Sequence, residues 1–203
     1  NNVIDATASF VAQQYQDFLT RDPDTSGFNF WQNEINSCGN NQGCVEVKRI
    51  NVSAAFYLSI EFQQSGSIVY RSNLASFGKM PRFNQFFIDS ARISRNVIVN
   101  QTGWEALIEG NKQAFYKGWV QQPNFQSEFP GSMNADQFVD KLNQNAGGVL
   151  TPSERTTLIN VLGNTPADLT RRASVLRALV EDVDFVNKEF NRMFVFMEYL
   201  AYL

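Results

Sequence analysis

The stretch "FVAQQYQDFLTRDPDTSGFNFWQNEI", residues 10–35, contains two helical patterns joined by a sharp turn. Between Val11 and Phe18, apolar residues recur at i, i+4 and i+7, which is the spacing of one helical face. Pro23 cannot continue a helix, whereas the carboxylate of Asp24 can accept hydrogen bonds from the first N–H groups of a new one. Apolar residues then resume at helical spacing. The stretch therefore predicts two helices packed together around a tight turn.

The helical period continues through the rest of the chain. Residues 46–64 have the pattern of one largely buried helix. Two capping boxes, Thr102-Gly-Trp-Glu105 and Thr151-Pro-Ser-Glu154, mark helix starts. No segment alternates apolar and polar residues between hairpin turns. We expect an all-α fold, a multi-helix bundle of about eight to ten helices joined by short loops.

A weak internal repeat indicates how the helices are organised. "RINVSAAFYLSIEF", residues 49–62, aligns with "RASVLRALVEDVDF", residues 172–185. The alignment predicts two related helical units, one in residues 1–78 and one in residues 134–203. Connecting helices would then occupy residues 79–133.

Composition excludes several classes of function. The net charge of −3 disfavours a nucleic-acid partner, which requires a basic face. The sequence has no histidine, so Ser-His-Asp triads and His-ligated metals are excluded. A hydrolase would have to use carboxylates, and the two acidic groups come with no recognisable motif. These groups are Glu181, Asp182 and Asp184, and Glu105 with Glu109. We therefore expect a protein that is not an enzyme.

Two cysteines, Cys38 and Cys44, are separated by a short loop that contains two glycines. Such a loop can bring the two sulfur atoms into bonding range, and a disulfide implies an oxidising compartment. The alternative is two free thiols in a cytosolic protein. The chain begins with Asn, and no apolar stretch is long enough to span a bilayer. We expect an extracellular or cell-surface protein whose export signal has been removed.

The turn at residues 22–27 also has the front half of a calcium loop. Asp22, Asp24 and Ser26 occupy the positions of its first three oxygen ligands. The closing position holds Asn33 in place of a bidentate acid, so calcium is the weaker interpretation. The structural interpretation assigns roles in the turn and its helix cap to five residues. These are Arg21, Pro23, Asp24, Gly27 and Trp31.

The same stretch resembles the signature of a bacterial family catalogued as domain of unknown function 4214. The family pattern F-V-x-x-x-Y-x-x-x-L-x-R-x-P-D-x-x-G-x-x-x-W is matched here by nine residues. They are Phe10, Val11, Tyr15, Leu19, Arg21, Pro23, Asp24, Gly27 and Trp31. The family's later S-x-E-F element is matched by Ser59, Glu61 and Phe62, and the good match covers residues 8–78.

The resemblance implies a helical module of secreted or surface-attached bacterial proteins, often beside repeat or adhesion domains, and it implies no reaction. The Y-x-x-x-L-x-R-x-P run is also distantly similar to phycobilisome linker domains, which are helical assembly modules. That second similarity is an analogy at the level of the fold.

The last stretch of the chain is apolar nearly all round, which predicts burial or docking on a partner. Phe194, Phe196, Tyr199 and Tyr202 are its candidate interaction residues. Our first hypothesis is a non-catalytic interaction or assembly module with a protein partner or a second copy of itself. The alternative is a carbohydrate-binding module, with calcium as a potential helper and with Trp31, Trp104 and Trp119 as candidate stacking residues.

Two glycosylation sequons occur, one beginning at Asn51 and one at Asn100. A helical position for Asn51 and a capping role for Thr102 explain both without a glycan.

Overall fold

Helices and the loops that join them make up the part of the chain that the structure describes. The computed structural model describes residues 6–202, and within this range it has eleven helices and no strand. They are α1 (Thr7–Leu19), α2 (Thr25–Asn36), α3 (Gln42–Tyr57), α4 (Ile60–Phe77), α5 (Phe83–Ser94), α6 (Trp104–Val120), α7 (Pro123–Glu128), α8 (Ala135–Asn145), α9 (Pro152–Leu162), α10 (Leu169–Val180) and α11 (Val183–Tyr202). The all-α prediction is confirmed, with one helix more than the expected range.

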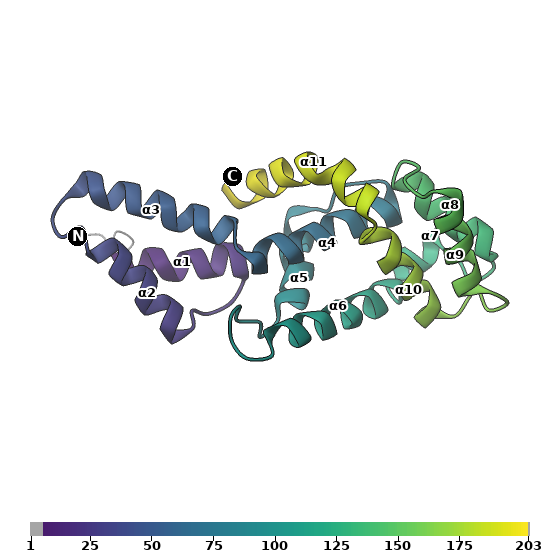
Figure 1. Ribbon diagram of the computed structural model, residues 1–203, viewed down its shortest axis with the longest axis horizontal. Coiled ribbons are helices and arrows are strands. Elements are labelled where there is room, and N and C mark those ends of the chain that lie inside the picture. Colours follow the sequence, from purple (N-terminus) through teal and green to yellow (C-terminus); the bar gives the residue numbers. More distant parts are fainter. Residues whose placement is uncertain (1–5, 203) are drawn as a thin grey trace.

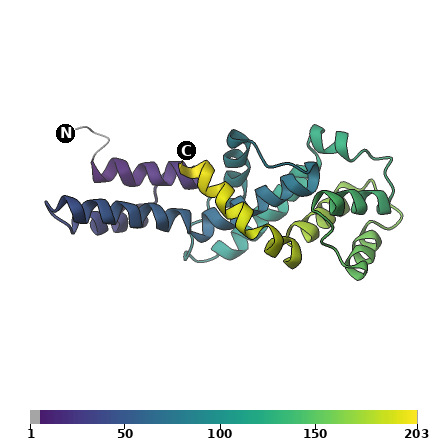
Figure 2. The ribbon, with the colours of Figure 1, turned by 90° about the horizontal axis from the view of Figure 1, so that it is seen from above.

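The molecule is elongated, and α4 runs through its middle (Figure 1). Helices α1 to α3 form an arm at one end, and α7 to α9 lie at the other end. Helix α11 extends along one long edge and ends beside the arm, as the view from above also shows (Figure 2). There the hydroxyl of Tyr57 donates to the backbone oxygen of Phe194 at 2.6 Å. The C-terminal helix therefore ties the arm to the rest of the molecule.

The predicted continuous helix over residues 46–64 is wrong. The structure breaks it between α3 and α4, where Ser59 has an extended backbone with ψ 145°. The Ser59 hydroxyl oxygen accepts a hydrogen bond from the Phe62 N–H at 3.2 Å, which caps the new helix. Serine competes for backbone hydrogen bonds in this way, so it starts a helix more readily than it continues one.

The weak sequence repeat corresponds to a repeated helix–break–helix arrangement. In the second copy, α10 ends at Val180 and α11 begins at Val183. The Asp182 carboxylate accepts from the Phe185 N–H at 3.1 Å, as Ser59 does from Phe62. Both phenylalanines are buried, with exposed fractions of 1% for Phe62 and 0% for Phe185. The order α1–α4 thus has a counterpart in α8–α11, and the division into two related units stays a prediction.

The expected boundaries of these units fall at helix ends. Gly78 ends α4 in the left-handed conformation, with φ 63°, and Asn134 starts α8 with a complete capping box. Thr151 and Glu154 form the predicted capping box of α9. The box predicted at Thr102 is wrong: α6 begins one residue later, because Gly103 adopts φ 84° and is itself the N-cap. The buried apolar side chains form one cluster through all three segments.

The predicted disulfide is confirmed. Cys38 and Cys44 are bonded, with their Cα atoms 5.6 Å apart, and the bond closes the loop between α2 and α3. Between residues 6 and 202, no helix combines the length and the apolar character that a bilayer crossing requires.

Candidate functional site

The turn between α1 and α2 is built around the carboxylate of Asp24. One of its oxygens accepts hydrogen bonds from the Gly27 N–H and the Ser26 hydroxyl, each at 2.8 Å. The predicted N-cap role of Asp24 is therefore confirmed. Its other oxygen accepts from the Tyr15 hydroxyl at 3.3 Å and lies 3.5 Å from the Arg21 guanidinium.

Gly27 is needed for the close approach of α1 and α2. A Cβ atom built on Gly27 would collide with the hydroxyl oxygen of Tyr15 and would lie 3.0 Å from a carboxylate oxygen of Asp24. Tyr15 is only 3% exposed, so it has little room to move. The signature glycine thus allows the tyrosine to reach the cap.

Replacing Gly27 by alanine should lower the free energy of unfolding by about 1–3 kcal/mol, the usual cost of overpacking. The additional change Tyr15→Phe removes the colliding hydroxyl, so the double variant should lose less than the sum of the two single variants. Chemical denaturation of the three variants measures both quantities. Strictly additive losses would contradict the proposed collision.

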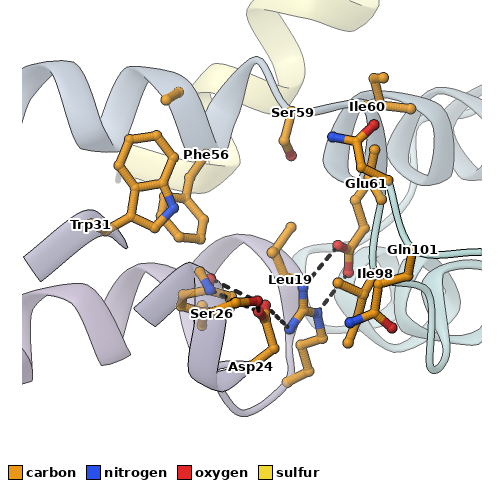
Figure 3. A pocket seen from close by; sticks show the side chains of 16 residues that line it. Leu19, Asp24, Ser26, Trp31, Phe56, Ser59, Ile60, Glu61, Ile98 and Gln101 are labelled. Carbon is orange, nitrogen blue, oxygen red and sulfur yellow. Dashed lines mark hydrogen bonds and ion pairs between the residues drawn. The ribbon is translucent and has the colours of Figure 1, made fainter. Parts of the chain in front are cut away.

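Arg21 connects the turn to the start of α4. Its Nε and Nη2 atoms donate to the two carboxylate oxygens of Glu61, at 3.0 Å and 3.1 Å (Figure 3). Its guanidinium also lies over the Tyr15 ring, 4.9 Å from the centroid. The bidentate pair joins residues that are forty positions apart in sequence. It brings the R-x-P-D part of the signature together with the S-x-E-F part.

The environment of this cluster alters its acidities. Burial raises the pKa of Glu61, although the hydrogen bond and charge of Arg21 act against it. Burial and the neighbouring Asp24 carboxylate raise the pKa of Tyr15 to about 12. Burial also favours the neutral form of Asp24, but the hydrogen bonds from Gly27 and Ser26 outweigh it and hold its pKa below the ordinary value.

A pocket of about 510 Å³ opens beside this cluster, and we call it the signature pocket. One wall holds the aromatic rings of Trp31 and Phe56, whose centroids are 5.7 Å apart. Glu61 lies on the opposite side of the hollow, and Ser59 lies above (Figure 3). Arg21, the partner of Glu61, also lines the pocket. Most signature residues whose side chains are not buried in the core therefore converge on one hollow.

The remaining wall of the signature pocket was not predicted from the sequence. It is the loop between α5 and α6, residues 98–101, which contributes Ile98 and Gln101 (Figure 3). The position of this loop depends on how α5 and α6 pack against α4, and no local motif records that. The nearest local indication of a turn in this loop is Asn100, which adopts a positive φ of 72°.

The geometry at the proposed calcium ligands is that of a capped turn. Asp22 accepts a hydrogen bond from the Gln16 side chain at 2.9 Å, while Ser26 donates to Asp24. Within residues 6–202 there is no group of three or more His, Cys, Asp or Glu residues that could hold a metal ion. Calcium binding by this turn stays a prediction.

The two sequons lie in different environments. Asn51 is exposed in the middle of α3, and Asn100 is exposed at the rim of the signature pocket.

The acidic groups considered for hydrolysis are occupied in part by structural contacts. Glu109 pairs with Arg177 at 2.6 Å, and Asp182 caps α11.

The four aromatic residues predicted as an interaction surface do not lie on one face. Phe194 and Phe196 are half-buried and pack inward, against Tyr57 and Tyr70 respectively. Tyr199 and Tyr202 are exposed, by 63% and 49%. Because α11 turns by about 100° per residue, the four side chains are spread over about 200° of its circumference. Phe196 and Tyr199 border one groove, while Phe194 and Tyr202 both contact Tyr57.

Of the three tryptophans, Trp119 belongs to the core and donates to the Ser76 hydroxyl at 2.9 Å. Trp31 and Trp104 are half-buried. Trp31 alone among them lines the signature pocket.

Fold and site define a disulfide-containing, all-α module with a mixed apolar and polar pocket at a capped interhelical turn. Residues 2–66 match the model of the family described as domain of unknown function (DUF4214). The expected resemblance is thereby confirmed for this segment, which carries both parts of the signature. No curated protein and no solved structure matches the chain.

Proposed function

We propose that this chain is a non-catalytic, extracellular interaction module that associates with a second copy of itself. The disulfide supports an oxidising, extracellular location. The complete lack of histidine and the engagement of Glu61 by Arg21 support a role without catalysis. One observation carries the proposal of self-association: an exposed apolar face on α11.

This α11 face consists of Arg192, Val195, Glu198 and Tyr199. Val195 is 62% exposed and Tyr199 is 63% exposed, and they border a groove of about 600 Å³ that also includes Met80. Met80 widens the apolar surface, since it lines the same groove and is 53% exposed. An apolar surface of this kind is typical of a protein contact.

The charges of the α11 face favour a second copy as the partner. Arg192 precedes Val195 by one helical turn, and Glu198 follows it by one turn; both are exposed. If two copies of α11 pack antiparallel about a two-fold axis at Val195, Arg192 of each copy lies level with Glu198 of the other. Such a face is self-complementary, as a symmetric dimer requires.

Size-exclusion chromatography with light scattering tests this proposal. The unaltered chain should show a mass that rises towards twice 23.0 kDa with increasing concentration. Val195→Glu should shift it to the monomer, because two carboxylates would be buried at the two-fold axis. Val47→Glu is the matched control: Val47 is 57% exposed but lies on α3, so this variant should still associate.

Exchange of the two charges tests the antiparallel arrangement. Glu198→Arg alone should weaken association, and the double variant with Arg192→Glu should restore it. A chain that remains monomeric at every concentration up to about 100 μM would remove the proposal, because functional contacts of lower affinity rarely bury enough surface.

Carbohydrate binding is the second candidate function, and the position of Trp31 favours it. The indole lines the signature pocket together with polar side chains, which is a combination that sugar sites use. A glycan array, probed with and without a calcium chelator, tests this candidate and any part that calcium plays in it. If no glycan binds with or without the chelator, this candidate function is discarded.

A further inference from the structure

The signature pocket has the size and the mixed lining of a small-molecule site. Its volume of about 510 Å³ lies within the range of ligand pockets, which is about 300–1,000 Å³. Phe56 is 3% exposed and fixed by its contacts with Tyr15 and Phe18, so the aromatic wall is rigid. A rigid wall limits the conformational entropy that the protein loses when a ligand binds.

Several hydrogen-bonding groups of the pocket have no partner within residues 6–202. The indole N–H of Trp31 and the side-chain amide of Gln101 make no hydrogen bond there. The Ser59 oxygen accepts from the Phe62 N–H, and its own hydrogen remains available. Figure 3 shows the indole nitrogen of Trp31 on the side of the ring that faces the hollow. These donors converge on one space from three segments of the chain.

The charges of the pocket are compensated internally. Arg21 is its cation, held by two hydrogen bonds to Glu61 and lying 3.5 Å from Asp24. An anionic ligand would have to compete with both carboxylates for Arg21, and a cation would have to compete with Arg21 for them. The oxygens of Glu61 still have lone pairs that can accept hydroxyl hydrogens. The electrostatics therefore favour an uncharged ligand that carries hydroxyl groups.

We infer that the signature pocket binds one ring of a neutral saccharide without calcium. The apolar C–H face of the ring packs on Trp31, and its hydroxyl groups meet Ser59, Gln101 and the free lone pairs of Glu61. This inference rests on the second candidate function and adds the position, the charge of the ligand and its independence from metal. It does not depend on self-association.

Isothermal titration calorimetry with glucose, galactose, mannose and N-acetylglucosamine tests the inference, after the glycan array has indicated which to use. The chain should bind at least one of these sugars with a dissociation constant in the millimolar range or tighter, and a chelator should not change it. Trp31→Phe keeps an aromatic ring but removes the pyrrole ring with its N–H, and Gln101→Ala removes the amide. Each should weaken binding about fivefold, the usual effect of one hydrogen bond.

Gln144→Ala is the matched control, because Gln144 is exposed on α8 and its side chain has no hydrogen-bond partner within residues 6–202. Its affinity should equal that of the unaltered chain. The titrations are repeated on Val195→Glu, so that loss of association and loss of sugar binding are scored separately. Absence of binding by a folded chain overturns the inference. So does binding that Trp31→Phe and Gln101→Ala leave unchanged, or that the chelator abolishes.

Discussion

Replacing Arg21 by alanine should lower the free energy of unfolding by about 3–5 kcal/mol, among the largest effects of any single change in this chain. The reason is that the substitution leaves Glu61, the ion-pair partner of Arg21, in place. The Glu61 side chain is only 4% exposed, and both of its oxygens accept from Arg21. Without Arg21, a buried carboxylate loses its cation and two hydrogen bonds at once. Urea denaturation at pH 7 measures the loss.

The loss should depend on pH, and the sign follows from the pKa of Glu61. Burial already raises this pKa above its ordinary value of 4.5 in the folded chain, and removal of Arg21 should raise it further. The folded variant then holds a proton on Glu61 that the unfolded chain releases, so its stability falls as pH rises above about 4.5. The destabilisation by Arg21→Ala should therefore be smaller at pH 5 than at pH 7.

Two further variants make this prediction specific. Arg21→Ala combined with Glu61→Gln should recover part of the lost stability, because a neutral amide is less costly to bury than a charge. Lys48→Ala removes an exposed ion pair with Glu34, whose side chain is 42% exposed, and should cost no more than about 1 kcal/mol. Equal losses from Arg21→Ala and Lys48→Ala, or a loss independent of pH, would show that Glu61 does not need its partner.

The sequence predicted the local chemistry of the signature better than its long-range contacts. Asp24 and Gly27 were expected to form a turn and its helix cap, and this follows from rules about neighbouring residues. Arg21 and Glu61 each belong to the family signature, yet their pairing across forty positions could not be derived from spacing. It exists because the break at Ser59 redirects the chain, and the sequence pattern had predicted an unbroken helix there.

The pocket shows the same limit. Trp31 was recognised as a candidate stacking residue, but its neighbours Ile98 and Gln101 come from a loop with no motif. The C-terminal helix shows the opposite error. Its aromatic residues were grouped by hydrophobicity, whereas in the structure Phe194 and Phe196 are half-buried and Tyr199 and Tyr202 are exposed. Val195, which is 62% exposed on the same helix, was overlooked because it is not aromatic.

Replacing Arg172 by methionine should lower the free energy of unfolding by about 4 kcal/mol. Arg172 is 1% exposed, and its guanidinium donates to the backbone oxygens of Phe129, Pro130 and Pro166. It also lies over the Phe138 ring, 4.7 Å from the centroid. It thereby joins α10 to the loop after α7 and to the loop before α10. Methionine fills much of the same volume but leaves the buried carbonyl of Phe129 and the part-buried carbonyl of Pro166 without this donor, and the Pro130 carbonyl keeps only the Met133 N–H.

The geometry of the guanidinium, and not its charge alone, should account for this loss. Arg172→Lys keeps the charge, but one ammonium group cannot reach three carbonyls arranged around a planar fork, so it should still cost about 2 kcal/mol. The adjacent Arg171 is the matched control: it is exposed and bonds to the carbonyls of Val161 and Leu162 at the end of α9. Arg171→Met should cost no more than about 1 kcal/mol in the same denaturation experiment. If Arg172→Lys were as stable as the unaltered chain, a single positive charge would be enough to hold the three carbonyls. If Arg171→Met lowered the free energy of unfolding as much as Arg172→Met, burial would not explain the importance of Arg172.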